Sequence, residues 1–372
     1  MSSPEISLII PLYNAEATVQ GLIDSIKVQT FEYFEAIFVN DGSTDASASL
    51  VADAAIRDDR IRLLVQPNAG PGVARNHGME AARGRYIMFA DADDRLMPDA
   101  MTRAFGCAER MQADIVVFQA RHLDARTDKH HSSPDRWDPT LFPEVFAGID
   151  CPDHLFSQFR NWPWDKLFRR SFLMRNGLRF PALHRTEDLP FTCKALSLAT
   201  RIAPLDEELY LYRVNNELSS TQTRDRHPLD FLHACEDFHA FLVAHGLFET
   251  FHADYLRWIG LCVFVNLTEL RTYEGFCEVF DALKAGGLAR LELLNVPDQA
   301  FTEPIHGQVI RGIAEGDCNH LLFTLWRLDS DKARAFDPVV AERDKLANSS
   351  ELRVGRAVVA LPQALLHALH RG

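Results

Sequence analysis

Short apolar runs recur through the first third of the chain, with segments of helical periodicity between them. The runs cover residues 6–12, 36–39, 61–65, 86–90 and 115–118. Their length and their many β-branched side chains favour buried strands. Between them, helical spacing extends over residues 19–26, 45–56 and 72–82. The alternation predicts an α/β domain in which helices cover both faces of a mostly parallel sheet.

The pattern changes beyond the fifth run. Segments of different character follow in turn: a polar stretch at 121–143, helical spacing at 167–175 and 189–199, and a strand-like stretch at 209–214. We expect the polar stretch to form a loop or an ordered insertion. After residue 223, apolar side chains repeat at helical intervals. We therefore predict three parts: an α/β domain over residues 1–224, a helical domain over 225–350 and an amphipathic tail over 351–372.

The tail differs in charge from the rest of the chain. From Leu352 to Gly372 it contains three arginines and no acidic side chain, whereas the whole chain carries a net charge of −13. On a helical wheel its basic and apolar side chains lie on opposite sides, a pattern typical of peripheral contact with a membrane. Packing of the apolar side on the protein itself or on a second subunit is the alternative, so the oligomeric state stays open.

Composition excludes several classes of protein. With 372 residues, 47% of them hydrophobic, most of the chain is not disordered, and the acidic balance argues against a nucleic-acid partner. The seven cysteines include no CxxC pair, which fits a reduced, cytoplasmic compartment. The N-terminus lacks the pattern of a signal peptide, and no run of about eighteen apolar residues predicts a membrane span.

Polar side chains follow the predicted strands, at the edge where open α/β sheets bind ligands. The fourth strand ends in the acidic run 91–94, and Asp99 follows shortly after. These carboxylates would repel one another unless a cation joined them, and we expect Asp91 and Asp93 to hold Mg²⁺ or Mn²⁺. Asp94 and Asp99 are better explained as caps of the helix that begins near Pro98.

A glycine-rich turn, Gly70-Pro71-Gly72, precedes a helix that carries Arg75 in its first turns. Backbone N–H groups and a fixed guanidinium could together receive a phosphate. Glycines before a helix are also common turn chemistry, so the motif becomes specific only through its neighbours.

The motifs occur together and in a fixed order: PLYNAEATVQGLIDSIKVQT, FVNDGSTD and NAGPGVARNHGMEAARGRYIMFADADD. In this combination the chain resembles family 2 of the inverting glycosyltransferases, of the bacterial polysaccharide type. The resemblance is close over about the first 100 residues and looser to about residue 224. It implies a GT-A fold with a Rossmann-like sheet, a nucleotide-sugar donor such as a UDP-sugar, and Mn²⁺ or Mg²⁺ as cofactor.

The resemblance also implies roles for individual residues. Tyr13 and Asp41 would hold the nucleotide base, Arg75 would lie near the phosphates, and Asp91 and Asp93 would form the DxD motif that binds the metal. With the neighbouring positions in these motifs, the predicted donor site comprises Pro11, Tyr13, Asp41, Gly70, Arg75, Asp91 and Ala92.

Inversion at the sugar carbon requires a general base on the acceptor side. Glu187 and Asp188 resemble the family's ED motif, and we predict Asp188 as the base, with Glu187 as the other catalytic candidate. A cap on the same helix by Thr186 is compatible with this role. Trp164 is either a sugar-stacking or a core aromatic residue, and Arg213 lies where the family often carries a phosphate-facing loop.

The predicted function is transfer of a sugar, with inversion, from the nucleotide donor to a saccharide or lipid-linked saccharide acceptor. The localisation that fits is cytoplasmic, with peripheral contact on the inner face of the membrane through the tail. Two alternatives remain: an inactive nucleotide-sugar-binding or scaffold protein, and a nucleotidyltransferase. The second would need a basic glycine-rich loop after the first strand, where this chain has PLYNAE.

Overall fold

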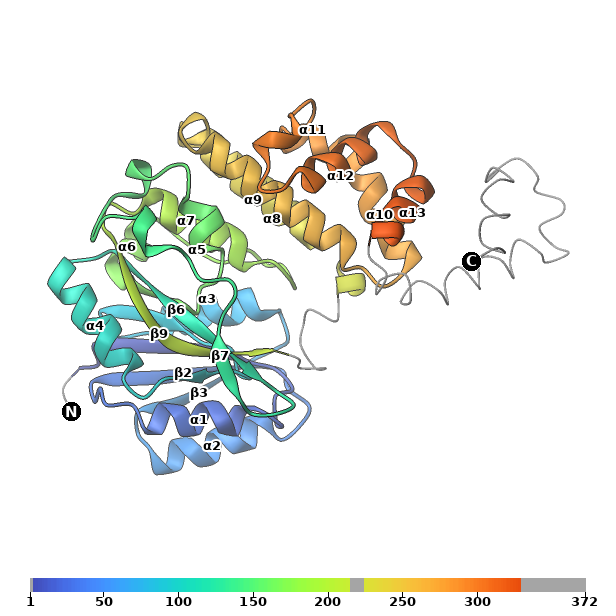
Figure 1. The fold of residues 1–372 in the computed structure, drawn as a ribbon. Coiled ribbons are helices and arrows are strands. Elements are labelled where there is room, and N and C mark those ends of the chain that lie inside the picture. Colours follow the sequence, from blue (N-terminus) through green and yellow to red (C-terminus); the bar gives the residue numbers. More distant parts are fainter. Residues whose placement is uncertain (1–2, 215–223, 329–372) are drawn as a thin grey trace, which may run out of the picture.

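The computed structural model describes residues 3–214 and 224–328, and it shows a helix-covered sheet with further helices stacked above it (Figure 1). The described strands form one sheet in the order β3-β2-β1-β4-β8-β6-β9-β5, and β7 pairs with β6. They are β1 (Ile6–Leu12), β2 (Phe34–Asp41), β3 (Ile61–Gln66), β4 (Tyr86–Phe89), β5 (Arg95–Leu96), β6 (Ile115–Asp124), β7 (His130–Ser132), β8 (Lys166–Arg169) and β9 (Ile202–Val214). The predicted α/β fold class is confirmed.

The sheet is parallel in its first half and mixed in its second. β1 pairs in parallel with β2 and β4, and β2 with β3. By contrast, β8 runs antiparallel to both β4 and β6. The helix expected from residue 167 is therefore wrong at its start, since α6 begins only at Arg170. The backbone at Leu167 and Phe168 instead pairs with strands on both sides, and this pairing overrides local helical spacing.

Helices cover the two faces of the sheet. On one face lie α1 (Val19–Lys27), α2 (Ser47–Arg57) and α4 (Ala100–Met111); on the other lie α3 (Pro71–Ala81), α5 (Leu155–Phe159), α6 (Arg170–Arg175) and α7 (Asp188–Leu198). Side chains of β1 alternate between the two cores: Leu8 and Ile10 pack in one and Ile9 in the other. Helix cover on both faces explains why β1 is apolar almost throughout.

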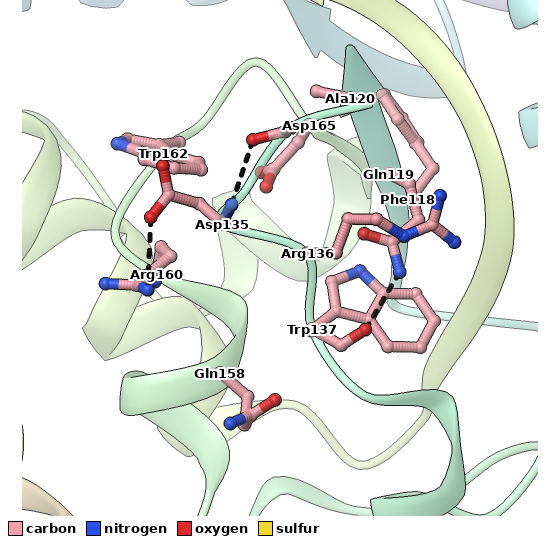
Figure 2. Close-up of a pocket in the computed structure, with 11 residues that line it drawn as sticks. Phe118, Gln119, Ala120, Asp135, Arg136, Trp137, Gln158, Arg160, Trp162 and Asp165 are labelled. Atoms are coloured by element: carbon pink, nitrogen blue, oxygen red, sulfur yellow. Dashed lines mark hydrogen bonds and ion pairs between the residues drawn. The ribbon is translucent and has the colours of Figure 1, made fainter. Parts of the chain in front are cut away.

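The polar stretch at 121–143 is an ordered insertion. β6 continues through its first residues to Asp124, and the chain turns back to form β7. Further along, Trp137 (Figure 2) is buried and packs edge-on against Phe159 of α5. The insertion thus covers one edge of the second half of the sheet.

The helical C-terminal region is also confirmed. It contains α8 (Asp230–Ala244), α9 (Phe248–Thr268), α10 (Tyr273–Ala282), α11 (Leu288–Arg290), α12 (Pro304–Glu315) and α13 (Cys318–Leu328). One apolar core continues from β1 and α7 into α8 and α9. No helix in the described part is long and apolar enough to cross a bilayer. The boundary near residue 224 stays a prediction, and the amphipathic tail at 351–372 lies outside the described residues.

Candidate active site

Arg75 lies at the centre of a buried ion-pair network. Its side chain, on α3, donates through Nη1 to Oε1 of Glu187 at 2.5 Å and through Nη2 to Oδ1 of Asp91 at 2.7 Å. The residue is only 5% exposed. Burial alone would lower the pKa of the guanidinium, but Asp91 and Glu187 outweigh it and raise that pKa. A permanent positive charge therefore joins the end of β4 to the start of α7.

Close packing of α3 against the segment 180–187 brings Glu187 to this centre. A Cβ atom on Gly72 would lie 2.6 Å from the carbonyl oxygen of Pro181, so only glycine allows this approach. One turn later, Asn76 makes two hydrogen bonds to the same segment. Its Nδ2 donates to the carbonyl of Phe180 at 2.8 Å, and its Oδ1 accepts from the N–H of Phe180 at 3.0 Å. The Gly-Pro-Gly turn thus serves this contact as well as the start of the helix.

Asp188 is half-buried beside the network, at the first position of α7. The side chain of Asn161 donates a hydrogen bond to its carboxylate. Burial, followed by repulsion from Glu187, raises the pKa of Asp188 to about 7. The expected cap by Thr186 is absent: Glu187 occupies the cap position of α7 with no side-chain cap bond, and Thr186 has a φ of +58°. A carboxylate with this pKa suits general base catalysis near neutrality.

Asp91 and Asp93 offer oxygen ligands to a cation. The side chain of Asp91 is 32% exposed, and Asp93 is half-buried. Nowhere in residues 3–214 and 224–328 do three or more His, Cys, Asp or Glu side chains form a metal-binding group. Two carboxylates fit Mg²⁺ or Mn²⁺ when substrate phosphates and water complete the coordination. The donor chemistry of this acidic run therefore suits a metal held jointly by protein and nucleotide.

The other acids of the run do not cap a helix with their side chains. Asp94 is buried and accepts hydrogen bonds from the hydroxyl of Tyr210 at 2.8 Å and from the N–H of Arg213 at 2.7 Å. Burial, and then repulsion from its acidic neighbours, raises the pKa of Asp94. Asp99 occupies the cap position of α4 but makes no side-chain cap bond. The capping prediction is wrong for Asp94, because its carboxylate binds partners in β9. It is confirmed for Asp99 in position, although the side chain makes no cap bond.

Asp41 ends β2 on the same edge of the sheet. Its Oδ1 accepts from Nε2 of Gln66 and the N–H of Ala69, both at 2.8 Å, and its Oδ2 accepts from the N–H of Gly70 at 2.9 Å. Gly70 has a φ of +91°, which favours glycine. Tyr13, just past β1, is 53% exposed. Asp41 therefore fixes the turn that leads into the helix of Arg75.

The remaining predicted donor residues occupy less open positions. Pro11 lies within β1, opposite Val39 of β2. Ala92 is buried in the turn after β4. Arg213 donates through Nε to the carbonyl of Asp93 at 2.7 Å, so it supports the acidic run. Pro11, Ala92 and Arg213 therefore support the backbone around the site rather than presenting open side chains to a ligand.

An aromatic stack that we did not predict from the sequence borders the acidic run. The ring of Trp164 stacks on Trp162 at 4.9 Å, on Tyr210 at 4.7 Å and on Tyr212 at 5.1 Å between centroids. Trp164 is 4% exposed, so its core interpretation is the correct one. The pattern Tyr-x-Tyr was a usable signal, because alternate residues of a strand share one side and both tyrosines lie on β9. Trp162 and Trp164 lie in the turn before β8, where this rule does not apply.

Carboxylates of the helical region hold both segments next to Asp188. Asp230, at the start of α8, accepts from the N–H groups of His184 at 2.9 Å and Arg185 at 3.1 Å. Asp254, on α9, accepts from the N–H of Phe156 at 2.5 Å. The first contact fixes the approach to α7, and the second fixes α5, which leads to Asn161. The C-terminal helices therefore take part in positioning this site.

Comparisons with known proteins identify the family. The family model "Glycosyl transferase family 2" matches residues 7–170. The succinoglycan biosynthesis protein ExoO of Rhizobium meliloti (strain 1021) is 33% identical over 250 residues, which are 66% of this chain and 70% of ExoO. The chain belongs to glycosyl transferase family 2.

Other members are similar over shorter shares of their length. The uncharacterized glycosyltransferase EpsJ of Bacillus subtilis (strain 168) is 37% identical over 217 residues, 57% of this family 2 chain and 62% of EpsJ. The chain spans less than two thirds of EpsJ and of two further curated relatives. A crystal structure of Staphylococcus aureus TarS with UDP covers 84% of this chain and 92% of its own, with 20% identity and a TM-score of 0.48.

Proposed function

We propose that this family 2 protein is an inverting glycosyltransferase, which moves a sugar from a UDP-sugar onto a hydroxyl of a saccharide or lipid-linked saccharide acceptor. The observation that carries the proposal is the buried Arg75 centre, bonded to Asp91 and Glu187 with Asp188 beside it. A permanent cation, two acidic ligands and a carboxylate of raised pKa thus meet at one edge of the sheet.

Charge on the leaving diphosphate is the first demand of the reaction. Asp91 and Asp93 would hold the divalent cation, which would neutralise the phosphate charge that develops as the bond between the anomeric carbon and the diphosphate oxygen breaks. Arg75 keeps Asp91 in place through its 2.7 Å ion pair. Because this guanidinium is buried, its charge acts through a medium of low dielectric and offsets the negative charge of Asp91 and Glu187, which would otherwise repel the phosphates.

Deprotonation of the acceptor hydroxyl is the second demand. Asp188 takes this proton as the hydroxyl oxygen attacks the anomeric carbon from the face opposite the leaving group. Asn161 orients the carboxylate through its hydrogen bond. Glu187 is less suited to the role, since its Oε1 already accepts from Arg75. A single displacement with this geometry inverts the anomeric configuration.

Recognition of uracil follows from the free capacity of Asp41. An ionised carboxylate has about four acceptor positions, and three donors already use three of them. One position remains, on Oδ2. Uracil offers one ring N–H, whereas guanine offers a ring N–H and an amino group on the same edge. A single remaining acceptor position therefore favours UDP over GDP, with the exposed ring of Tyr13 available for stacking on the base.

Titration calorimetry and product analysis test the proposal. We expect UDP to bind with Mn²⁺, to bind far more weakly with EDTA or in Asp93→Ala, and to bind more tightly than GDP. Incubation of UDP-sugars with Mn²⁺ and saccharide acceptors should give a product of inverted anomeric configuration, assigned by NMR. UDP affinity that is indifferent to metal would contradict the metal site, and a product of retained configuration would contradict the mechanism. Binding without any turnover would favour a scaffold protein.

A further inference from the structure

Two cysteines contact each other where α10 packs against α13, away from the sheet (Figure 1). Sγ of Cys277, on α10, lies 2.8 Å from Sγ of Cys318, the first residue of α13, although 41 positions separate them along the chain. Both thiols are free, and both residues are half-buried. The pair therefore lies at the surface of the fold, where solutes have access to it.

The other cysteines of the chain differ from this pair in contact or in exposure. All seven lie in the described residues, and four of them are buried. Cys235 and Cys262 share a hydrogen bond, but both belong to the buried group. Cys151 is half-buried, and burial raises the pKa of its thiol. Within the described structure, mutual contact and partial exposure thus occur together only at Cys277 and Cys318.

Two contacts between the same segments flank the thiols. The hydroxyl of Tyr273, on α10, donates to Oδ1 of Asn319, on α13, at 2.8 Å. Lys284, just past α10, donates to the carbonyl of Gly316, just before α13. These contacts hold the two segments together on both sides of the pair. A covalent S–S bond is about 2 Å long, so small rotations of the two side chains would join the sulfurs.

The contact makes Cys277 the stronger acid of the pair. The hydrogen bond from Cys318 is the main cause that lowers the pKa of Cys277 to about 7; burial opposes it, and a hydrogen bond from Tyr273 adds to it. The same contact, together with burial, raises the pKa of Cys318. Near neutral pH, Cys277 is therefore partly a thiolate while Cys318 keeps its proton. The thiolate is the form of cysteine that reacts with oxidants.

We propose that Cys277 and Cys318 are a redox-modification site, which forms a reversible disulfide on reaction with a hydroperoxide. This inference goes beyond the proposed function and does not depend on it. Cys277 would be the residue that the peroxide oxidises first, and Cys318 would be the residue that resolves the oxidised sulfur. Disulfides of this kind in reducing compartments are transient and serve redox sensing.

Hydrogen peroxide supplies the oxidant, and the two thiols supply two electrons. The sulfur of the Cys277 thiolate attacks one peroxide oxygen; the S–O bond forms, the O–O bond breaks, and the second oxygen leaves as hydroxide. The sulfur of Cys318 then attacks the sulfenic sulfur of Cys277, so that the S–S bond forms and the S–O bond breaks. The departing hydroxide takes the proton of Cys318 and becomes water. A dithiol reverses the reaction by exchange, in which it is itself oxidised.

The cross-link would close a loop that contains α11 and α12. Closing this loop lowers the conformational entropy of the unfolded chain, so the oxidised protein should unfold at a temperature a few degrees higher. Neither cysteine belongs to the residues predicted to bind the donor or the metal, or to act as base. UDP binding should therefore be the same in the reduced and oxidised protein.

Peptide mapping by mass spectrometry tests the proposal on the full chain. The reduced protein is treated with hydrogen peroxide near neutral pH, its remaining thiols are alkylated, and it is digested without reductant. We expect a cross-linked peptide that contains Cys277 and Cys318, lacks two hydrogens and is cleaved by dithiothreitol. Oxidation should also raise the unfolding temperature, and dithiothreitol should reverse that rise.

Serine variants separate the roles of the two thiols. Cys318→Ser should leave Cys277 as a sulfenic acid that dimedone traps, and Cys277→Ser should react with peroxide several times more slowly than the unmodified chain. Neither variant should show the rise in unfolding temperature. Cys151→Ser is the matched control, because it removes a half-buried thiol outside the pair; it should behave as the unmodified chain does. Circular dichroism shows that each variant is folded.

Four results would overturn the inference. They are the absence of the cross-linked peptide, a disulfide of Cys277 or Cys318 with another cysteine instead, faster oxidation of Cys151 than of Cys277, and zinc that the unmodified chain retains and both pair variants lose. The last result would show a metal site in place of a redox site. Mass and unfolding temperature are measured without substrate, so failure here leaves the proposed glycosyl transfer untouched.

Discussion

Replacing Asp188 by Asn tests the proposed base directly. The substitution keeps the size of the side chain and its contact with Asn161, but the amide cannot accept the acceptor's proton. General base catalysis contributes about 10²- to 10⁴-fold, which corresponds to about 3–5 kcal/mol of transition-state stabilisation. We therefore expect kcat for transfer to fall by that factor. UDP affinity should change by no more than a few-fold, because Asp188 makes no hydrogen bond to Arg75.

The raised pKa of Asp188 adds a second signature. A base acts in its ionised form, so kcat/KM of the unmodified chain should rise as the pH increases through about 7 and then level off. Asp188→Asn should remove this rise from its residual activity. UDP release in a coupled assay gives the rates, and calorimetry gives the affinity.

Glu187→Gln is the matched control within the doublet. It removes the negative charge that pairs with Arg75 at 2.5 Å while leaving Asp188 intact. We expect a lower unfolding temperature and weaker UDP binding, with a smaller loss of kcat than in Asp188→Asn. Full transfer by Asp188→Asn, together with loss of transfer in Glu187→Gln, would refute the assignment.

Three further predictions concern stability. Gly72→Ala should lower both the unfolding temperature and the rate of UDP-sugar transfer, because the new Cβ would clash with the carbonyl of Pro181. Gly106→Ala is the control: its Cβ would point into open space, so stability should stay the same or rise. Lys166→Met should destabilise by about 3–5 kcal/mol in urea titration, because it leaves Asp165 buried and unpaired. Burial raises the pKa of Asp165 to about 6, above the value of 3.8 in the unfolded chain. The folded state therefore holds this proton more tightly, and the free energy of unfolding should decline as the pH rises from about 4 to 6. Asp165→Asn should remove that decline.

Local pattern located the edge of the sheet that carries the site. Asp41 and Asp91 each follow an apolar run, and the carboxyl ends of parallel strands lie at one edge, so their common edge of the sheet could be predicted. The side chains that these residues contact could not be predicted. Arg75 pairs with Glu187 across 112 positions of the chain, and Asp94 receives its hydrogen bond from Tyr210 across 116. Such contacts depend on how whole elements pack, which spacing within one segment does not encode.

The strand β8 and the orphaned indole of Trp137 illustrate the same limit. Residues 167–169 belong to a segment with helical spacing, but their backbone pairs with β4 and β6 and so forms part of the strand β8. Trp137 sits in a polar stretch without periodicity, and only the folded structure shows that its N–H is buried and unpaired. The identities of these residues were visible in the sequence; their surroundings were not.

Asp230 and Asp254, the two carboxylates of the C-terminal helices that bind the first domain, limit how this protein can be recombined with other family members. Asp230 binds the backbone of residues 184–185, just before α7, and Asp254 binds the start of α5. If the C-terminal helices were replaced by those of another family member, the new helices would therefore determine how these two segments lie beside Asp188. A chimera would need matching acids at both places to keep its catalytic geometry. Substitutions in α8 and α9 can therefore alter the proposed site by shifting the backbone around Asp188, without any direct contact with a ligand.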